Sequence, residues 1–285
     1  MARRARGGPR LVTLSSDLGA EYSAQVKAVL AQRVDPGRVV ELTHDLPAHG
    51  VAEGAFLLEA MAKGFPAGTV HLAIVDPGVG GERAPLAVEC SDGSRLVGPD
   101  NGLLYPLAET LGLRRAYRID PSRVRNSPRV GTTFDARDLF APAAARLARG
   151  ARAASLGPAM RPRVFRLPRA TRRSGGASGE VVHVDRYGNL ISNIPTGWVG
   201  SRVDRLVVRV GGRRRSVPWT RSYEAAGPGR ILALGSSFGT LEVAVGEGNA
   251  ARRLGARVGA TIDARWVTGA SSGSQSVNSE RPRRR

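Results

Sequence analysis

The feature that most constrains the fold is an alternation of strand-like and helix-like segments in the first part of the chain. Apolar runs that end in polar residues occupy 10–17, 38–45 and 68–76. Between them, 23–33 and 50–65 place apolar side chains at helical spacing. Parallel strands need a crossover connection, which a helix usually supplies. This order therefore predicts a mostly parallel sheet covered by helices.

The character of the chain changes after residue 167. Short apolar runs separated by Gly-rich turns follow, which is typical of a small barrel or sandwich. The sequence thus predicts an α/β N-terminal domain with a mostly parallel sheet, plus a smaller all-β, barrel-like C-terminal domain. The predicted parts are a basic tail at 1–9, the α/β domain at 10–167, a Gly/Ser-rich linker at 168–178, the β-barrel domain at 179–268 and a disordered basic tail at 269–285.

The chain of 285 residues is strongly basic, with a formal net charge of +19. Its arginine clusters lie in the tails and at turn edges, and no zinc spacing, RNA-binding signature or helix-turn-helix pattern accompanies them. The charge therefore predicts weak nonspecific phosphate binding at most, and no specific nucleic-acid partner.

Membrane, disulfide and metal chemistry are not indicated. No apolar stretch approaches the roughly 18–20 residues that span a bilayer, and no signal peptide is apparent, so we expect a cytoplasmic protein without a membrane partner. The single cysteine, Cys90, excludes an internal disulfide. A buried strand thiol is the first interpretation, and a nucleophilic thiol is the alternative. The four histidines lack metal-ligand spacing, so no metal site is expected.

Polar stretches follow the predicted parallel strands, where ligands of open α/β sheets bind. One of them, VDPGVGGER at 75–83, lacks the spacing of a dinucleotide loop and the Gly-Lys-Ser/Thr ending of a P-loop. It instead predicts a carboxylate–guanidinium pair in which Arg83 holds Asp76 ionised at the end of a buried strand. The alternative is an Asp-Pro-Gly turn beside a surface arginine.

Other polar residues also have a ligand-binding and a structural interpretation. Asp17 is either the N-cap of a helix or an acceptor for the two hydroxyls of a ribose. Asp135 also precedes a helix, where a carboxylate suits the helix dipole. Asp185, Tyr187 and Asn189 form either a polar hairpin turn or a ligand site. In the second case they supply an acceptor for an ammonium group, an aromatic face and an amide that reads a base edge.

Seven segments carry a resemblance that no single one of them carries alone. In chain order they read SDLGAEYSAQVKAVL, ELTHDLPAHGVAEGAFLLEA, HLAIVDPGVGGER, VGPDNGLLYPL, TTFDARDLFAPAAARLARG, GEVVHVDRYGNLISNI and LGSSFGTLEVAVGEGNAA. Together they resemble the S-adenosyl-L-methionine hydroxide adenosyltransferase family, which is similar to the fluorinases and chlorinases. The resemblance runs from about residue 10 to residue 268, through both predicted domains.

The resemblance implies an N-terminal α/β domain, a C-terminal β-barrel, and a homotrimer with active sites between subunits. It implies hydrolysis of S-adenosyl-L-methionine to adenosine and L-methionine, by attack of water or hydroxide on the ribose 5′-carbon. S-adenosyl-L-methionine is then the substrate, and no cofactor is needed. By position, the resemblance implies that Asp76, Arg83 and Asp135 are catalytic.

The other implied residues bind substrate. Asp17 would bind the ribose hydroxyls, and Pro77, Phe134 and Tyr187 would flank the adenosyl group. Asn189, Glu242 and Val245 would lie on the adenine side. Asp185 and Ser237 would bind the amino-acid end.

Asp135 departs from the family pattern. The hydrolases resemble TFHGRD where this chain reads TFDARD, so an aspartate stands at the position of a catalytic histidine. A carboxylate is a poorer base near pH 7 than a neutral imidazole. The alternatives are a binding module for adenosine or S-adenosyl-L-methionine with little or no turnover, or a related adenosyltransferase that uses another nucleophile, as the halogenases do. The charge of Asp76 opposes the halogenase alternative because it would repel a halide.

Overall fold

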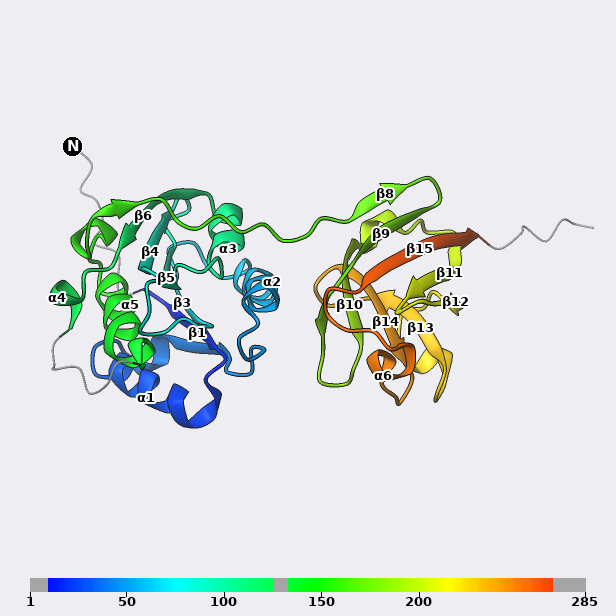
Figure 1. Cartoon of the computed structure of the whole chain (residues 1–285), viewed down its shortest axis with the longest axis horizontal. Coiled ribbons are helices and arrows are strands. Elements are labelled where there is room, and N and C mark those ends of the chain that lie inside the picture. Colours follow the sequence, from blue (N-terminus) through cyan, green and yellow to red (C-terminus); the bar gives the residue numbers. More distant parts are fainter. Residues whose placement is uncertain (1–9, 126–132, 269–285) are drawn as a thin grey trace, which may run out of the picture. The chain divides into compact units, whose positions relative to one another are not determined.

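The structure is a computed structural model that describes residues 10–125 and 133–268. The chain divides into two compact units between Leu167 and Pro168, and each unit has its own hydrophobic core (Figure 1). The basic tails predicted at 1–9 and 269–285 lie outside the described residues.

A seven-stranded mixed sheet forms the centre of the N-terminal unit. Its strands are β1 (Val12–Ser16), β2 (Val39–Thr43), β3 (Val70–Ile74), β4 (Pro85–Cys90), β5 (Arg95–Pro99), β6 (Leu113–Arg118) and β7 (Ala159–Met160). They lie in the order β2-β1-β3-β5-β4-β6-β7. The first four strands of this order are mutually parallel, and β4, β6 and β7 add antiparallel pairs. The predicted α/β domain with parallel strands is thereby confirmed.

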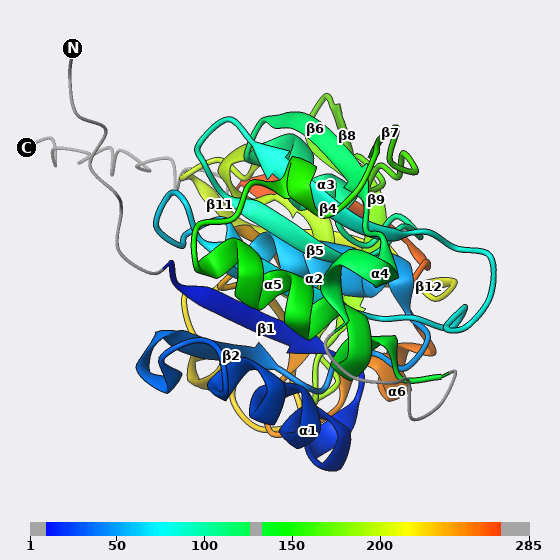
Figure 2. The same cartoon turned by 90° about the vertical axis from the view of Figure 1, so that its left-hand side faces the viewer.

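Helices cover both faces of this sheet (Figures 1 and 2). On one face α1 (Gly19–Ala31) packs against α5 (Ala141–Ala148), and on the other α2 (Val51–Ala62) packs against α3 (Tyr105–Thr110). A short α4 (Pro121–Val124) follows β6. Opposite faces are expected because β2 and β3 flank β1 on its two sides and each crossover is right-handed. Within residues 10–125 and 133–268, no helix is both long enough and apolar enough to cross a membrane.

The strand order creates a crevice at the carboxyl ends of β1 and β3. The chain leaves β1 toward β2 and leaves β3 toward β5 and β4, which are opposite directions along the sheet. Ligands of open α/β sheets bind where the winding reverses in this way. Asp17 directly follows β1, and its N–H donates to the carbonyl oxygen of Ile74 at the end of β3, at 3.1 Å. The fold therefore brings the Asp17 and Asp76 loops together.

An antiparallel sheet curls into a nearly closed barrel in the C-terminal unit. Its strands are β8 (Thr171–Arg173), β9 (Gly176–Val184), β10 (Leu190–Pro195), β11 (Val203–Val210), β12 (Arg213–Pro218), β13 (Ile231–Gly235), β14 (Thr240–Val245) and β15 (Thr261–Thr268). They follow the order β12-β11-β15-β9-β10-β14-β13, with β8 paired to β9. The chain just beyond β12 meets β13 where Trp219 bridges Ala233. A short α6 (Ala250–Leu254) precedes β15. The predicted barrel-like domain is confirmed.

The structure of residues 168–178 differs from the predicted linker. They include β8 and the first residues of β9, which form an antiparallel hairpin. Gly175 has a φ of +67° in the turn between the two strands, a conformation that glycine adopts without steric cost. The Gly-rich composition therefore reflects a tight turn within the second unit.

Cys90 lies buried in β4. Burial raises the pKa of its thiol to about 12, so the thiolate required of a nucleophile is strongly disfavoured near neutral pH. This agrees with the interpretation of Cys90 as a buried strand thiol.

Replacing Leu206 by alanine is expected to lower the free energy of unfolding of the C-terminal unit by about 2–5 kcal/mol. Leu206 is fully buried in the barrel core, and the change removes its contacts and leaves a cavity. Trp198, Trp219 and Trp266 all pack against this core, so tryptophan fluorescence during urea unfolding reports the effect. The control is Val267→Ala on the exposed side of β15, for which we expect less than about 1 kcal/mol. Equal shifts for the two variants would contradict the core position of Leu206.

Candidate functional site

A cleft of about 270 Å³ lies at the carboxyl ends of β1 and β3. Five residues predicted from the sequence line it together, and a sixth, Arg83, bonds to two of them. The five lining residues are Asp17, Asp76, Pro77, Phe134 and Asp135.

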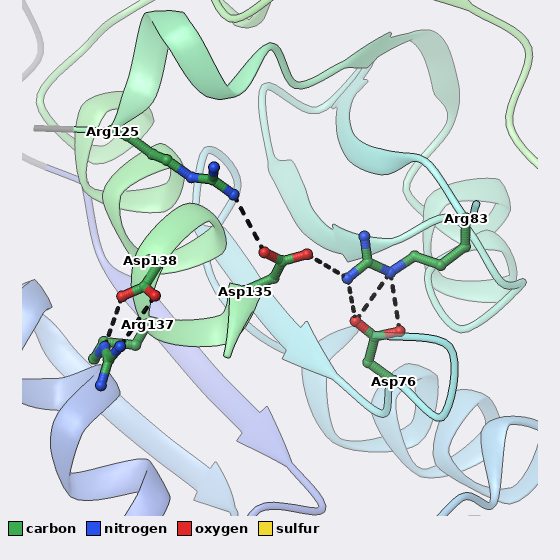
Figure 3. A network of polar contacts seen from close by, with 6 residues as sticks. All are labelled: Asp76, Arg83, Arg125, Asp135, Arg137 and Asp138. Carbon is green, nitrogen blue, oxygen red and sulfur yellow. Dashed lines mark hydrogen bonds and ion pairs between the residues drawn. The ribbon is translucent and has the colours of Figure 1, made fainter. Parts of the chain in front are cut away.

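Arg83 holds two carboxylates at once (Figure 3). Its Nε donates to both oxygens of Asp76 at 3.0 Å, and its Nη2 donates to Oδ2 of Asp76 at 2.6 Å. The same Nη2 donates to Oδ2 of Asp135 at 2.7 Å. Burial disfavours the guanidinium charge, but the hydrogen bonds to the two aspartates outweigh it, so the pKa of Arg83 is raised. Asp76 and Arg83 therefore form the predicted pair rather than a turn beside a surface arginine.

A second guanidinium approaches the other side of Asp135. Nη2 of Arg125 lies 3.4 Å from Oδ1 of Asp135, whose side chain is only 6% exposed. The four side chains Asp76, Arg83, Asp135 and Arg125 carry two negative and two positive charges. Buried carboxylates are tolerated when they are compensated in this way. Sequence reasoning missed Arg125, because nothing in the local pattern relates it to Asp135.

A π-helical turn at Ala136–Phe140 follows Asp135 directly. The N–H of Ala141 donates to the carbonyl oxygen of Ala136, five residues back instead of four. Pro142 comes next and has no N–H for the regular helical bond, and turns of this kind are frequent at functional sites. Asp135 occupies the N-cap position, but its side chain makes no capping bond. Its carboxylate bonds to Arg83 instead, so the capping interpretation does not describe it.

Asp17 is not the N-cap of α1 either. Leu18 holds that position, and no side chain caps the helix. Oδ2 of Asp17 accepts a hydrogen bond from the backbone N–H of His49 at 3.2 Å. His49 has a φ of +62°, which is uncommon for a residue other than glycine. The carboxylate is thus held beside the cleft by a backbone donor from the loop before α2.

Phe134 forms an aromatic wall of the cleft. The ring of Tyr22 meets it edge-on, with 5.6 Å between the ring centres. The guanidinium carbon of Arg137 lies over the Phe134 ring, 4.7 Å from the ring centre. Arg137 also forms an ion pair with Asp138. Figure 3 shows this second pair apart from the Asp76–Arg83–Asp135 network. The wall gives the cleft an apolar surface beside its carboxylates.

The C-terminal unit has a cavity of its own, of about 710 Å³, lined in part by Asp185, Tyr187, Asn189 and Val245. Oδ1 of Asp185 accepts from the N–H groups of Tyr187 and Asn189, at 2.9 and 2.8 Å. Oδ2 accepts from Nδ2 of Asn189 at 2.9 Å. A carboxylate has about four acceptor positions, so these three bonds fix Asp185 and leave capacity for a ligand. The hairpin-turn and ligand-binding interpretations are therefore compatible.

Glu242 and Ser237 lie outside the lining of that cavity. Glu242 is 3% exposed, and it accepts a hydrogen bond from the hydroxyl of Tyr223 at 2.7 Å. Burial raises the pKa of Glu242. Tyr223 does line the cavity, and sequence reasoning missed it. Ser237 is exposed in the turn between β13 and β14, at the other end of β14 from Val245.

Metal binding finds no support in the described part of the chain. Across residues 10–125 and 133–268, no group of three His, Cys, Asp or Glu side chains is arranged to hold a metal ion. Nδ1 of His71 bonds to the hydroxyl of Thr13 at 2.8 Å, and burial lowers the pKa of His71 to about 4. His71 is therefore a neutral core residue.

Comparison with known proteins assigns the family. The N-terminal domain model of the SAM hydroxide adenosyltransferases matches residues 12–157, and their C-terminal domain model matches residues 179–263. The chain belongs to the SAM hydroxide adenosyltransferase family.

Individual relatives agree with this family. A protein of Thermus thermophilus named (R)-S-adenosyl-L-methionine hydrolase is 41% identical over 263 residues, which cover 89% of this chain and 98% of that protein. A fluorinase of an Actinoplanes species is 27% identical over 219 residues, covering 67% of this chain and 73% of that enzyme. A solved structure from Thermotoga maritima superposes with a TM-score of 0.82 at 27% identity, covering 90% of this chain and all of that one.

Replacing Arg83 by methionine is expected to lower the free energy of unfolding by about 3–5 kcal/mol, because Asp76 and Asp135 would stay buried without their shared cation. Urea unfolding followed by far-ultraviolet circular dichroism measures the change. The control is Lys27→Met, which removes an exposed ion pair with Glu41 and should cost about 1 kcal/mol or less. If Arg83→Met lowers the free energy of unfolding no more than the control does, the network contributes little to stability.

Proposed function

We propose that this chain hydrolyses S-adenosyl-L-methionine to adenosine and L-methionine. The observation that carries the proposal is the Asp76 carboxylate, fixed by Arg83 at the edge of a cleft that also contains Asp17 and Phe134. These residues supply a base, an acceptor for ribose hydroxyls and an aromatic surface for the adenosyl group. The hydrolase name of the Thermus thermophilus relative supports the same reaction.

The proposed step is an in-line displacement at the ribose 5′-carbon. The oxygen of a water bound by Asp76 forms a bond to this carbon as the carbon–sulfur bond breaks. The electron pair of the broken bond goes to the sulfonium sulfur, which becomes the neutral thioether of methionine, and the water gives up one proton to the Asp76 carboxylate. Since the sulfonium is already an activated leaving group, the step needs no general acid and no cofactor. The protein supplies the position of the water and a partly dry cleft.

The C-terminal cavity suits the other parts of the substrate. Asn189 is assigned to the adenine edge and Tyr187 to the adenosyl face, while Asp185 is assigned to the methionine ammonium. Pro77, Ser237, Glu242 and Val245 keep the binding roles that the family resemblance implies.

We further propose that the chain forms a homotrimer in the cytoplasm, in which the cleft of one subunit and the C-terminal cavity of a neighbour complete one site. The N-terminal unit offers carboxylates for the ribose and the water, and the C-terminal unit offers groups for the amino acid and the base, which supports this arrangement.

Asp135 favours a second candidate, a module that binds adenosine or S-adenosyl-L-methionine without turnover. Its carboxylate is engaged by Arg83 and Arg125, and a carboxylate is a weaker base than the imidazole of the family pattern. A halide-using reaction is disfavoured, because Asp76 and Asp135 both place negative oxygens at the cleft.

The deciding experiment incubates the purified protein with the R and S sulfonium epimers of S-adenosyl-L-methionine separately. Chromatography then measures adenosine and methionine. Equal amounts of the two products above a buffer blank would support hydrolysis. Absence of adenosine with both epimers, at protein concentrations near that of the substrate, would reject it. Calorimetric binding without product would then establish the binding module.

The substitution Asp76→Asn keeps the shape of the side chain and removes its charge and basicity. We expect turnover to fall by roughly 10²–10⁴-fold, the usual cost of a lost general base. Affinity for adenosine should stay within about threefold, because the binding roles belong to other residues. Single-turnover kinetics and adenosine calorimetry measure the two quantities. Parent-level turnover in Asp76→Asn would remove Asp76 from the mechanism.

The substitution Asp135→His restores the family residue beside Arg83. We expect turnover at pH 7.5 to rise by about tenfold, since a neutral imidazole is the better proton acceptor there. Asp135→Asn is the matched control, because it removes the carboxylate without adding a base. A turnover of Asp135→His no higher than that of the parent would show that the aspartate is no handicap, and a turnover equal to that of Asp135→Asn would show that the imidazole does not act as a base.

A further inference from the structure

One face of the C-terminal unit carries arginines that the proposed hydrolysis does not use. A hollow of about 380 Å³ is lined by Arg173, Arg209, Arg214 and Arg265, here called the arginine cradle. All four residues are exposed. The cradle shares no lining residue with the cavity that contains Asp185, so it is a separate feature of the barrel.

The strand register brings the four arginines together from β8, β11, β12 and β15, and Figure 1 labels these four strands. Arg209 on β11 pairs with Arg214 on β12. Arg265 on β15 pairs with Gly176 on β9, which in turn pairs with Arg173 on β8. Neighbouring strands lie about 4.8 Å apart, so the four spacings from β12 to β8 measure about 19 Å. Gly176 lies close to β15, since a Cβ added there would clash with the carbonyl oxygen of Ala264.

The cradle belongs to the outer face of the barrel. Along β11, Leu206, Val208 and Val210 are buried in the core, whereas Arg209 is exposed. This alternation is the period of two that a strand imposes. The arginines therefore face away from the core that stabilises the unit, and their side chains are available to a ligand.

The positive charge of the cradle exceeds its negative charge within the described residues. In that part of the chain no carboxylate forms an ion pair with any of the four arginines, and none of their side chains donates a hydrogen bond. Asp263 also lines the cradle and lies opposite Arg209 on the neighbouring strand, but its Oδ1 accepts from the hydroxyl of Ser178 at 2.7 Å and it forms no ion pair with Arg209. The lining therefore carries four positive charges and one negative charge. Like charges directly opposite each other on neighbouring strands, as in Arg209 and Arg214, oppose folding. A bound anion would remove this repulsion.

We propose that the arginine cradle binds the sugar–phosphate backbone of a nucleic acid without reading its sequence. Guanidinium groups pair well with phosphate oxygens, and no aromatic residue lines the cradle to stack on bases. A duplex presents about eleven phosphate charges over 19 Å of its axis, so its backbone matches the width of the cradle better than one small anion does.

The test uses the full chain and a fluorescein-labelled duplex of arbitrary sequence, with anisotropy measured at several salt concentrations. Four phosphate contacts give a slope of log affinity against log salt of about −3.6 from the cradle alone. Arg209→Glu/Arg265→Glu should weaken binding at least tenfold and reduce the magnitude of the slope by about 1.8. The matched control is Arg118→Glu/Arg152→Glu, which changes the net charge equally at two exposed positions of the N-terminal unit and should change affinity by less than about threefold.

Three results would overturn the proposal. Equal weakening in both double variants would assign the binding to net charge or to other segments. Displacement of the duplex by inorganic tripolyphosphate, at a phosphate-group concentration equal to that of the duplex, would indicate a small-anion site. A tenfold preference between two unrelated duplexes would indicate sequence reading. Urea unfolding confirms that each variant is folded, and Arg209→Gln/Arg265→Gln replaces the glutamate variant if it is not, with the same direction expected.

Discussion

The arrangement of the N-terminal site depends on one guanidinium placed between two buried carboxylates. Taking Asp76 and Asp135 out of water costs several kcal/mol for each charge unless a cation and hydrogen bonds offset the loss. Arg83 supplies both, so the loop after β3 and the start of the helix at Ala136 are tied to each other through its side chain. Arg125 then completes a set with no net charge. The two guanidinium groups therefore allow two carboxylates to stay charged at the edge of the cleft.

The topology determines where that set can lie. The winding of the sheet reverses between β1 and β3, and the cleft lies at the carboxyl ends of these two strands. Asp17 and Asp76 lie on the loops that follow these two strands. The barrel unit offers different chemistry, with amide, aromatic and carboxylate groups gathered on one polar hairpin.

Much of this fold could be predicted from the sequence, because apolar periodicity distinguishes the strands and helices and polar residues mark the strand ends. The Asp76–Arg83 pair could be predicted because both residues lie in one loop. Arg125 and Tyr223 could not, because their contacts with Asp135 and Glu242 arise from tertiary packing without a local pattern. The hairpin in 168–178 was missed for another reason, since glycine and serine are common in both flexible linkers and tight turns.

The contact between Asp17 and His49 determines which residues can replace His49. The backbone N–H makes the bond to the Asp17 carboxylate, and the imidazole takes no part in it. Because that bond already orients the carboxylate in the folded protein, less rotamer entropy of Asp17 remains to be lost if a ligand binds to it. What matters at residue 49 is therefore a positive φ rather than a titratable ring. Glycine or asparagine, which adopt this conformation readily, would preserve the orientation of the acceptor as well as histidine does.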